Sequence, residues 1–93
     1  MNKKIYVITI LLEHESYDTD AYSDVRMDWS GVQNYVKDEL DYYHNECNWR
    51  ITDANFEKAN QLLSEEKNIT TICLKNPASL ITFSIISYNI SME

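Results

Sequence analysis

Apolar side chains fill residues 5–12 almost without interruption, so a β-strand formed there would be apolar on both sides. The two sides are Ile5, Val7, Thr9 and Leu11, and Tyr6, Ile8, Ile10 and Leu12. Such a strand belongs in the middle of a sheet, with both faces covered, or with helices over one face and an aromatic edge over the other. The run is too short for a secretory signal or a membrane span, and it leads directly into Glu13 with no small-residue cleavage site.

A second strand is predicted from the alternation that follows. Val25, Met27 and Trp29 alternate with charged residues, which is typical of a half-buried strand. We expect residues 3–17 and 21–29 to form a hairpin, with its turn at residues 18–20. The alternative is that residues 14–29 form a long acidic loop.

A first helix is predicted after Ser30, which suits an N-cap, with Gln33 completing a capping box. Helical spacing places one set of residues on a single buried face, and the helix should end near Asn48. The set is Val32, Tyr35, Val36, Leu40, Tyr43 and Cys47. Asp38, Asp41 and Tyr42 fall on the other side.

A second helix should begin at Thr52 or Asp53, with Ile51 and Phe56 forming a hydrophobic staple across its start. Its buried stripe consists of Phe56, Ala59, Leu62 and Leu63. Asn68 is the expected C-terminal cap, because Asn tolerates the left-handed backbone conformation.

The last quarter of the chain predicts a hairpin of two strands, residues 69–74 and 80–90, joined by a turn at residues 75–78 that contains Pro77. The element order is then strand, strand, helix, helix, strand, strand. We expect one α+β domain over residues 1–93, with a mainly antiparallel sheet of three to four strands and both helices on one face. The first and last strands should lie side by side in the middle.

Acidic side chains are concentrated in residues 13–28 and 37–46, where tyrosines lie among them, and the chain carries a net charge of −7. Such a surface repels nucleic acid and anionic membranes and attracts basic protein surfaces. Tyrosine adds large contact area with a polar tip. The predicted partner-binding residues are Glu13, Glu15, Tyr17, Asp18, Asp20, Tyr22, Asp24, Asp38, Asp41, Tyr42 and Glu46.

Other kinds of chemistry are poorly supported by the sequence. A calcium loop starting at Asp18 would place Ser23 and Trp29 where Gly and Glu are required. A zinc site would need His44 and Cys47 to meet His14 and Cys73, whereas the helical phase turns Cys47 toward the core. A chain with a single Gly has no phosphate-binding loop, and no nucleophile signature is present. We therefore expect no metal, no cofactor and no enzymatic activity.

Two cysteines are too few for a secreted disulfide scaffold, so Cys47 and Cys73 are expected to be reduced core residues of a cytoplasmic protein. The main hypothesis is a protein-binding inhibitor or adaptor that uses its acidic, tyrosine-bearing face against a basic partner. Helical carboxylates can also take the place of phosphates in contacts with Arg, which would allow mimicry of nucleic acid. The alternative is an assembly module that forms oligomers through apolar or sheet-edge contacts.

The chain also resembles, in manner, the short acidic orphan proteins of phages and mobile elements of AT-rich bacteria. The resemblance lies in its Ile-, Asn- and Lys-rich usage, its Met-Asn-Lys-Lys start, its strand-hairpin-helix opening through Tyr43, and its near lack of Gly and Pro. The resemblance is one of general style along the chain, and it includes no specific motif. Many such proteins inhibit host defence systems, CRISPR effectors among them, so the resemblance implies a bacterial host cell and an inhibitory role.

Overall fold

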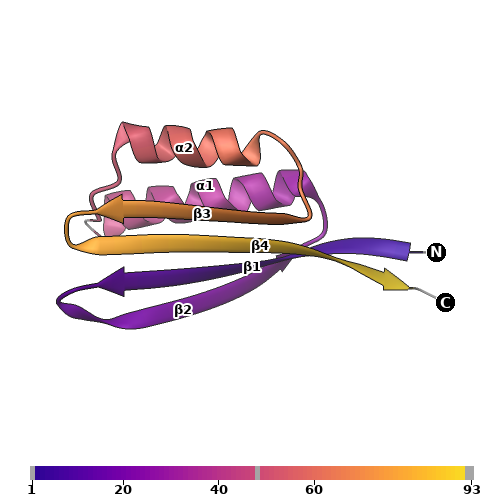
Figure 1. Ribbon diagram of the computed structural model, residues 1–93, viewed down its shortest axis with the longest axis horizontal. Helices are drawn as coiled ribbons and strands as arrows, with labels where there is room; N and C mark the ends of the chain where they lie inside the picture. Colours follow the sequence, from indigo (N-terminus) through magenta and orange to yellow (C-terminus); the bar gives the residue numbers. More distant parts are fainter. Residues whose placement is uncertain (1, 48, 92–93) are drawn as a thin grey trace.

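The strands and helices follow the predicted order. The computed structural model describes residues 2–47 and 49–91. Their elements are β1 (Asn2–His14), β2 (Tyr17–Arg26), α1 (Trp29–Glu46), α2 (Asp53–Leu63), β3 (Ile69–Asn76) and β4 (Ser79–Ser91). Within these residues the strands form one antiparallel sheet in the order β2-β1-β4-β3, with α1 and α2 on the same face (Figure 1). The predicted α+β class and the central pairing of the first and last strands are confirmed.

The core lies between the helices and one face of the sheet. Ile8 and Ile10 of β1, Ile72 of β3, and Phe83 and Ile85 of β4 are all fully buried there. The apolar stripe of α1 is Val32, Val36, Leu40 and Tyr43, as helical spacing predicts. In α2, Ala59 and Leu63 are buried, while Phe56 and Leu62 pack against the core. The side of β1 that faces the helices therefore carries Tyr6, Ile8, Ile10 and Leu12.

The second face of the sheet is open. Ile5, Val7 and Leu11 are only partly buried, and Thr9 is exposed. Of the two predicted alternatives, coverage of both faces within the chain is wrong, because the connections to α1 and α2 place both helices on one face. We call this surface the open sheet face.

The N-terminal hairpin is present, but its turn lies at Glu15 and Ser16 rather than at residues 18–20. The alternative of an acidic loop over residues 14–29 is thus wrong. Val25 and Met27 are about half exposed, at 47% and 53%. Val25 pairs with Val7 and so lies on the open sheet face. The alternation had predicted Val25 on the buried side of its strand, so the two sides of the strand are exchanged.

The helix boundaries correct two predicted caps, Ser30 and Asn68, and confirm one, Thr52. Asp28, not Ser30, is the N-cap of α1, and its Oδ1 accepts a hydrogen bond from the Gly31 N–H at 2.6 Å. Helix α1 ends at Glu46, and the predicted end at Asn48 falls outside the described residues. Thr52 caps α2 as predicted, accepting from the Asn55 N–H at 3.1 Å.

At the other end of α2 the cap is Ser64, not Asn68. Asn68 instead ties the start of β3 to β4. Its carbonyl accepts from the Ser87 N–H at 2.8 Å, and its Oδ1 accepts from the Ser87 hydroxyl at 3.0 Å. The residue predicted to end a helix therefore lies directly before a strand.

The cysteines are placed differently from the prediction as well. Cys47 and Cys73 are free and exposed, so their assignment to the core is wrong. Cys47 follows the last turn of α1, where the chain leaves the buried stripe. Cys73 pairs with Thr82 on the open sheet face, opposite in phase to the buried neighbours Ile72 and Leu74.

Candidate functional site

An acidic groove runs between the edge strand β2 and helix α1. It encloses about 520 Å³. Two aspartates and a tyrosine, Asp20, Tyr22 and Asp24, enter it from β2, since alternate residues of a strand point to the same face. Tyr35, Glu39 and Tyr42 enter it from α1. The remaining lining residues are Leu12, Ser23, Tyr43, Cys47 and Trp49. We call this surface the tyrosine groove.

Helical spacing explains why three residues of α1 form one wall of the tyrosine groove. Tyr35, Glu39 and Tyr42 follow each other at four and three residues, so they form one stripe on the side of α1 that faces β2. The stripe adjoins the buried one, which contains Tyr43. The groove exists because the sheet extends past α1 to the edge strand β2. Within the described chain, no further element covers the side of β2 that faces the helices.

Burial and nearby carboxylates raise the pKa of two groove tyrosines, Tyr35 and Tyr43. The Tyr43 hydroxyl donates to the Glu39 carboxylate, and burial, this hydrogen bond and the charge of Glu39 together raise the pKa of Tyr43 strongly. Burial, followed by the charges of Glu39 and Asp24, raises the pKa of Tyr35. At neutral pH the groove therefore offers phenol hydroxyls as donors beside carboxylates as acceptors.

The outer end of the α1 wall is more exposed. A hydrogen bond with Cys47, then the charge of Cys47 and slight desolvation, raises the pKa of Tyr42. Glu46 and Tyr22 act on the same hydroxyl through space, so both lie near it. The rings of Tyr42 and Tyr43 meet edge to face, with centroids 5.8 Å apart. Tyr42 is 54% exposed and is thus accessible to a partner.

A cation, Arg26, borders the groove. The Arg26 guanidinium lies 3.0 Å from Asp24 Oδ2 and 4.9 Å from the centroid of the Tyr35 ring. Both members of the ion pair are more than a third exposed, so the pair adds little to stability. Arg26 offsets one of the three lining carboxylates. No Lys or Arg among the described lining residues offsets Asp20 or Glu39 in the same way.

The structure divides the predicted partner-binding residues among several places. The tyrosine groove brings together Asp20, Tyr22, Asp24 and Tyr42, with Glu46 near Tyr42. Glu13 and Glu15 line a separate hollow beside Lys75 at the tip of the hairpins. The side chains of Tyr17 and Asp18 lie outside the described part of the structure.

Asp38 and Asp41 belong to another side of α1. Each is one residue before a groove residue, and a step of one residue turns about 100° around a helix. The groove residues that sequence reasoning missed are Tyr35, Glu39 and Tyr43. Their spacing of four was visible in the sequence, but Tyr35 and Tyr43 were assigned wholly to the core.

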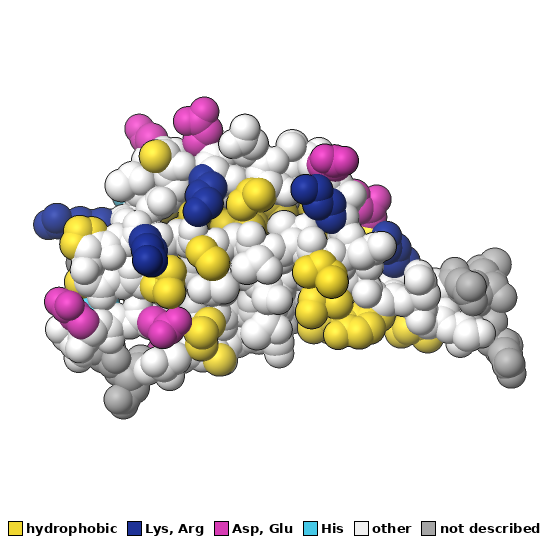
Figure 2. All heavy atoms as spheres, viewed as in Figure 1, with side chains coloured by type: hydrophobic (Ala, Val, Ile, Leu, Met, Phe, Trp, Pro, Cys, Tyr) yellow, Lys and Arg dark blue, Asp and Glu magenta, His cyan; other side chains and the backbone are white. Residues whose placement is uncertain are grey.

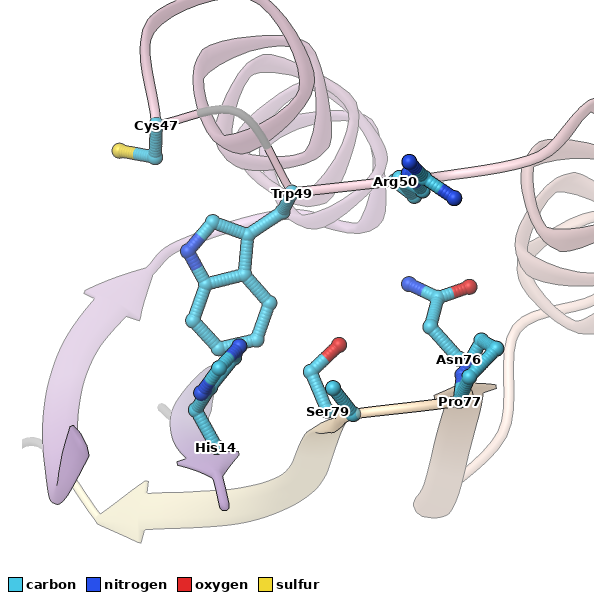
Figure 3. Close-up of a pocket in the computed structure, with 8 residues that line it drawn as sticks. His14, Cys47, Trp49, Arg50, Asn76, Pro77 and Ser79 are labelled. Carbon is cyan, nitrogen blue, oxygen red and sulfur yellow. The ribbon is translucent and has the colours of Figure 1, made fainter. Parts of the chain in front are cut away.

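A smaller pocket of about 290 Å³ adjoins the groove, and Cys47 and Trp49 line both. Figure 3 shows the Trp49 indole extending toward His14, and their rings meet edge to face with centroids 5.8 Å apart. The Cys47 sulfur points away from His14 in this view. Arg50, Asn76 and Ser79 complete the pocket. The thiol and the imidazole are therefore not arranged as a nucleophile and its base.

The described residues form neither a metal site nor a membrane-spanning helix. Among them, no three His, Cys, Asp or Glu side chains are placed to share a metal ion. Neither α1 nor α2 has the length and apolar character that a membrane span requires.

Comparison of the chain with protein-family models, with curated proteins and with solved structures finds no match in any of the three.

Proposed function

We propose that this chain is a non-enzymatic protein-binding protein, an inhibitor or adaptor, whose tyrosine groove binds a basic surface of another protein. The observation that carries the proposal is the meeting of Asp20, Asp24 and Glu39 with neutral tyrosines in one open groove. Carboxylates pair with Lys and Arg, and the rings supply contact area and cation–π faces.

The groove itself offers an example of the contact that we propose. Arg26 lies with its guanidinium over the Tyr35 ring while it also pairs with Asp24. An Arg side chain from a partner could make the same two contacts with Tyr22 or Tyr42 and with Asp20. Tyr22 is 52% exposed, so such a guanidinium could reach its ring. The groove therefore suits Arg-rich surfaces better than Lys-rich ones.

Basic surfaces of this kind are found on proteins that hold nucleic acid. We propose, as the finer form of the function, that the chain occupies such a surface on a phage-targeting defence effector, for example a CRISPR nuclease. The carboxylates would then take positions that phosphates otherwise fill. This form rests on the charge and shape of the groove together with the resemblance in style to phage-encoded inhibitors.

Charge reversals inside and outside the groove test the proposal. Asp20→Lys/Glu46→Lys alters the groove but leaves the Asp24–Arg26 ion pair and the Tyr43–Glu39 hydrogen bond intact. The control, Asp38→Lys/Asp41→Lys, makes the same change in net charge on another side of α1. Each variant and the unmodified chain would be immobilised and exposed to bacterial lysate, and the retained proteins identified by mass spectrometry.

We expect a basic protein to be retained by the unmodified chain and by the control, and to be lost with the groove variant. Its affinity for the unmodified chain should fall as salt rises. Equal retention by all three baits, or equal loss from both variants, would contradict a role for the groove.

A further inference from the structure

The open sheet face carries a row of four aliphatic side chains, one from each strand. Val25 of β2 pairs with Val7 of β1, Val7 pairs with Ile86 of β4, and Ile86 pairs with Ile69 of β3. Val25 is 47% exposed and Ile69 is 68% exposed. Ile5 and Tyr88 pair on the side nearer the termini and extend the apolar surface. Exposed aliphatic surface of this extent is unusual on a monomer that functions alone.

Beside this row lies a row of hydroxyl side chains. Ser23, Thr9, Ser84 and Thr71 are paired across the same strands, two positions further along each one. A hydroxyl both donates and accepts hydrogen bonds, so such a row can pair with an identical copy of itself. The next row, which contains Leu11 and Cys73, is again uncharged.

The charge of the protein lies elsewhere. None of the residues in these three described rows is charged, and the nearest charged positions on this face are Lys3, Glu13 and Lys75 at its ends. Figure 2 shows hydrophobic side chains gathered over the half of the sheet nearest the termini, with charged side chains toward the helices and the hairpin tips. With a net charge of −7, two copies of this chain can approach closely only through a surface of this kind.

The size of the face is also sufficient. With strands about 4.8 Å apart and same-side residues about 7 Å apart, three complete rows and their flanking positions cover about 500 Å² in projection. This area is of the same order as the value of about 800 Å² per partner that is common for stable interfaces.

We propose that the open sheet face is covered by a second copy of the same chain, in a two-fold symmetric dimer with the two sheets packed face to face. A two-fold interface needs a patch that is complementary to itself, and aliphatic and hydroxyl rows without charge satisfy that requirement. Facing sheets pack about 10 Å apart, with their side chains interdigitated. A basic protein would find no carboxylate in these rows, and an anionic membrane would be repelled by the net charge of −7.

Among the described residues this surface shares Ser23 of the edge strand β2 with the tyrosine groove, and otherwise the two lie on opposite sides of the sheet. On β2, Val25 shares the open sheet face with Val7, whereas Tyr22 lies in the groove on the opposite side. A dimer built in this way leaves both of its grooves free and presents two copies of the binding surface to a partner.

A pair of double variants tests the dimer. Val25→Lys/Ile69→Lys places a charge at each end of the aliphatic row. Tyr22→Lys/Tyr42→Lys is the matched control, since it adds the same two charges at similarly exposed positions of 52% and 54% in the groove. Circular dichroism establishes that each variant is folded. Sedimentation equilibrium gives its mass in low salt and in 1 M salt, where the Debye length is about 3 Å and interactions between exposed charges are screened.

We expect the unmodified chain and the groove variant to have twice the 11.0 kDa mass of the chain in both salts, because apolar contacts are not screened. The Val25→Lys/Ile69→Lys variant should be monomeric, with dimerisation weakened at least about 100-fold. A monomeric unmodified chain, or dissociation caused by the groove variant instead, would overturn the proposal. A monomer that binds neutral lipid vesicles would assign the face to a membrane instead.

The reactivity of Cys73 supplies a second measurement that does not depend on the lysine variants. In a Cys47→Ser chain, reaction of Cys73 with a thiol reagent should slow as the protein concentration rises, because dimerisation covers the open sheet face. In a Cys73→Ser chain, Cys47 lies outside that face and should react at a constant rate. Equal rates for Cys73 at low and high concentration would count against the dimer. Loss of groove binding with an intact dimer would contradict only the proposed function.

Discussion

The indole N–H of Trp29 donates a hydrogen bond to the backbone carbonyl of Leu63, with 3.0 Å between Nε1 and the oxygen. The first residue of α1 is thereby joined to the last residue of α2. The side-chain amide of Gln33 donates to the same carbonyl at 2.7 Å. Trp29 also meets Tyr6 edge to face, with centroids 5.5 Å apart, and so connects both helices with the central strand β1.

Replacing Trp29 with Phe removes the hydrogen bond and keeps an aromatic ring. We expect the free energy of unfolding to fall by about 1–2 kcal/mol, and Tm to fall by about 4–8 °C for each kcal/mol in a domain of this size. Thermal unfolding followed by circular dichroism measures the change.

The matched variant is Gln33→Ala, which removes the other donor to the same carbonyl. The double variant should cost more than the sum of the single ones, because only then does the Leu63 carbonyl lose both partners. Strict additivity would show that the shared acceptor does not couple the two helices.

The N-cap of α1 provides a second test. Asp28→Ala should lower the free energy of unfolding by about 1 kcal/mol, because the Gly31 N–H loses its acceptor. Ser30→Ala, at the position that the sequence alone suggested, should change it by less than about 0.5 kcal/mol. Urea unfolding of the two variants under identical conditions measures both values, and a larger effect at Ser30 would restore the original assignment.

Alkaline pH should destabilise the fold through Tyr43. Its pKa is raised above the ordinary value of 10.0 by burial and by its hydrogen bond to Glu39. A group with a raised folded-state pKa stabilises the protein fully below its unfolded pKa, and that contribution is lost as the pH rises above it. We therefore expect stability to fall above about pH 10, and to fall less steeply in Tyr43→Phe.

Urea unfolding between pH 8 and pH 11 measures this slope, and absorbance at 295 nm reports tyrosine ionisation. The control is Tyr88→Phe on β4, where the ring is 47% exposed. Identical pH slopes for the unmodified chain and Tyr43→Phe would contradict the assignment.

Neighbouring isoleucines of β4 point to opposite faces of the sheet and should behave differently. Ile85 is fully buried under the helices, so Ile85→Ala should cost about 2–5 kcal/mol at any protein concentration. Ile86 lies in the aliphatic row of the open sheet face. If a second copy covers that row, the cost of Ile86→Ala should grow with protein concentration. Thermal unfolding over a hundredfold range of concentration would show the difference, and its absence at Ile86 would count against the dimer.

Several features of the fold could be predicted because their signals are local. The eight-residue apolar run of β1, the helical spacing from Val32 to Tyr43, and the Thr52 cap each depend on residues close together in the chain. The caps at Asp28 and Ser64 were missed because neighbouring Ser and Asn residues are also good caps, and tertiary packing decides between them. Trp29 illustrates this competition. Its hydrogen bond to the Leu63 carbonyl favours a helix that begins at Trp29, directly after the cap Asp28.

The candidate site was predicted only in part, for a different reason. Asp20, Tyr22, Asp24 and Tyr42 belong to the predicted partner-binding set and do meet in the groove. Glu13 and Glu15 are close to them in sequence, but the hairpin carries those two carboxylates away to its tip. Asp38 and Asp41 point in another direction around α1, because the rotation of a helix separates adjacent residues.

The sequence by itself determined the element order, the antiparallel class and the central place of β1 and β4, since hydrophobic periodicity and turn residues act over a few positions. Only the tertiary structure decided which face of the sheet the helices cover, and hence that Val7, Val25, Ile69 and Ile86 form an uncovered row. A strand that is apolar on both sides does not encode which side is buried. That choice follows from the paths of the connections and from packing summed over the whole domain.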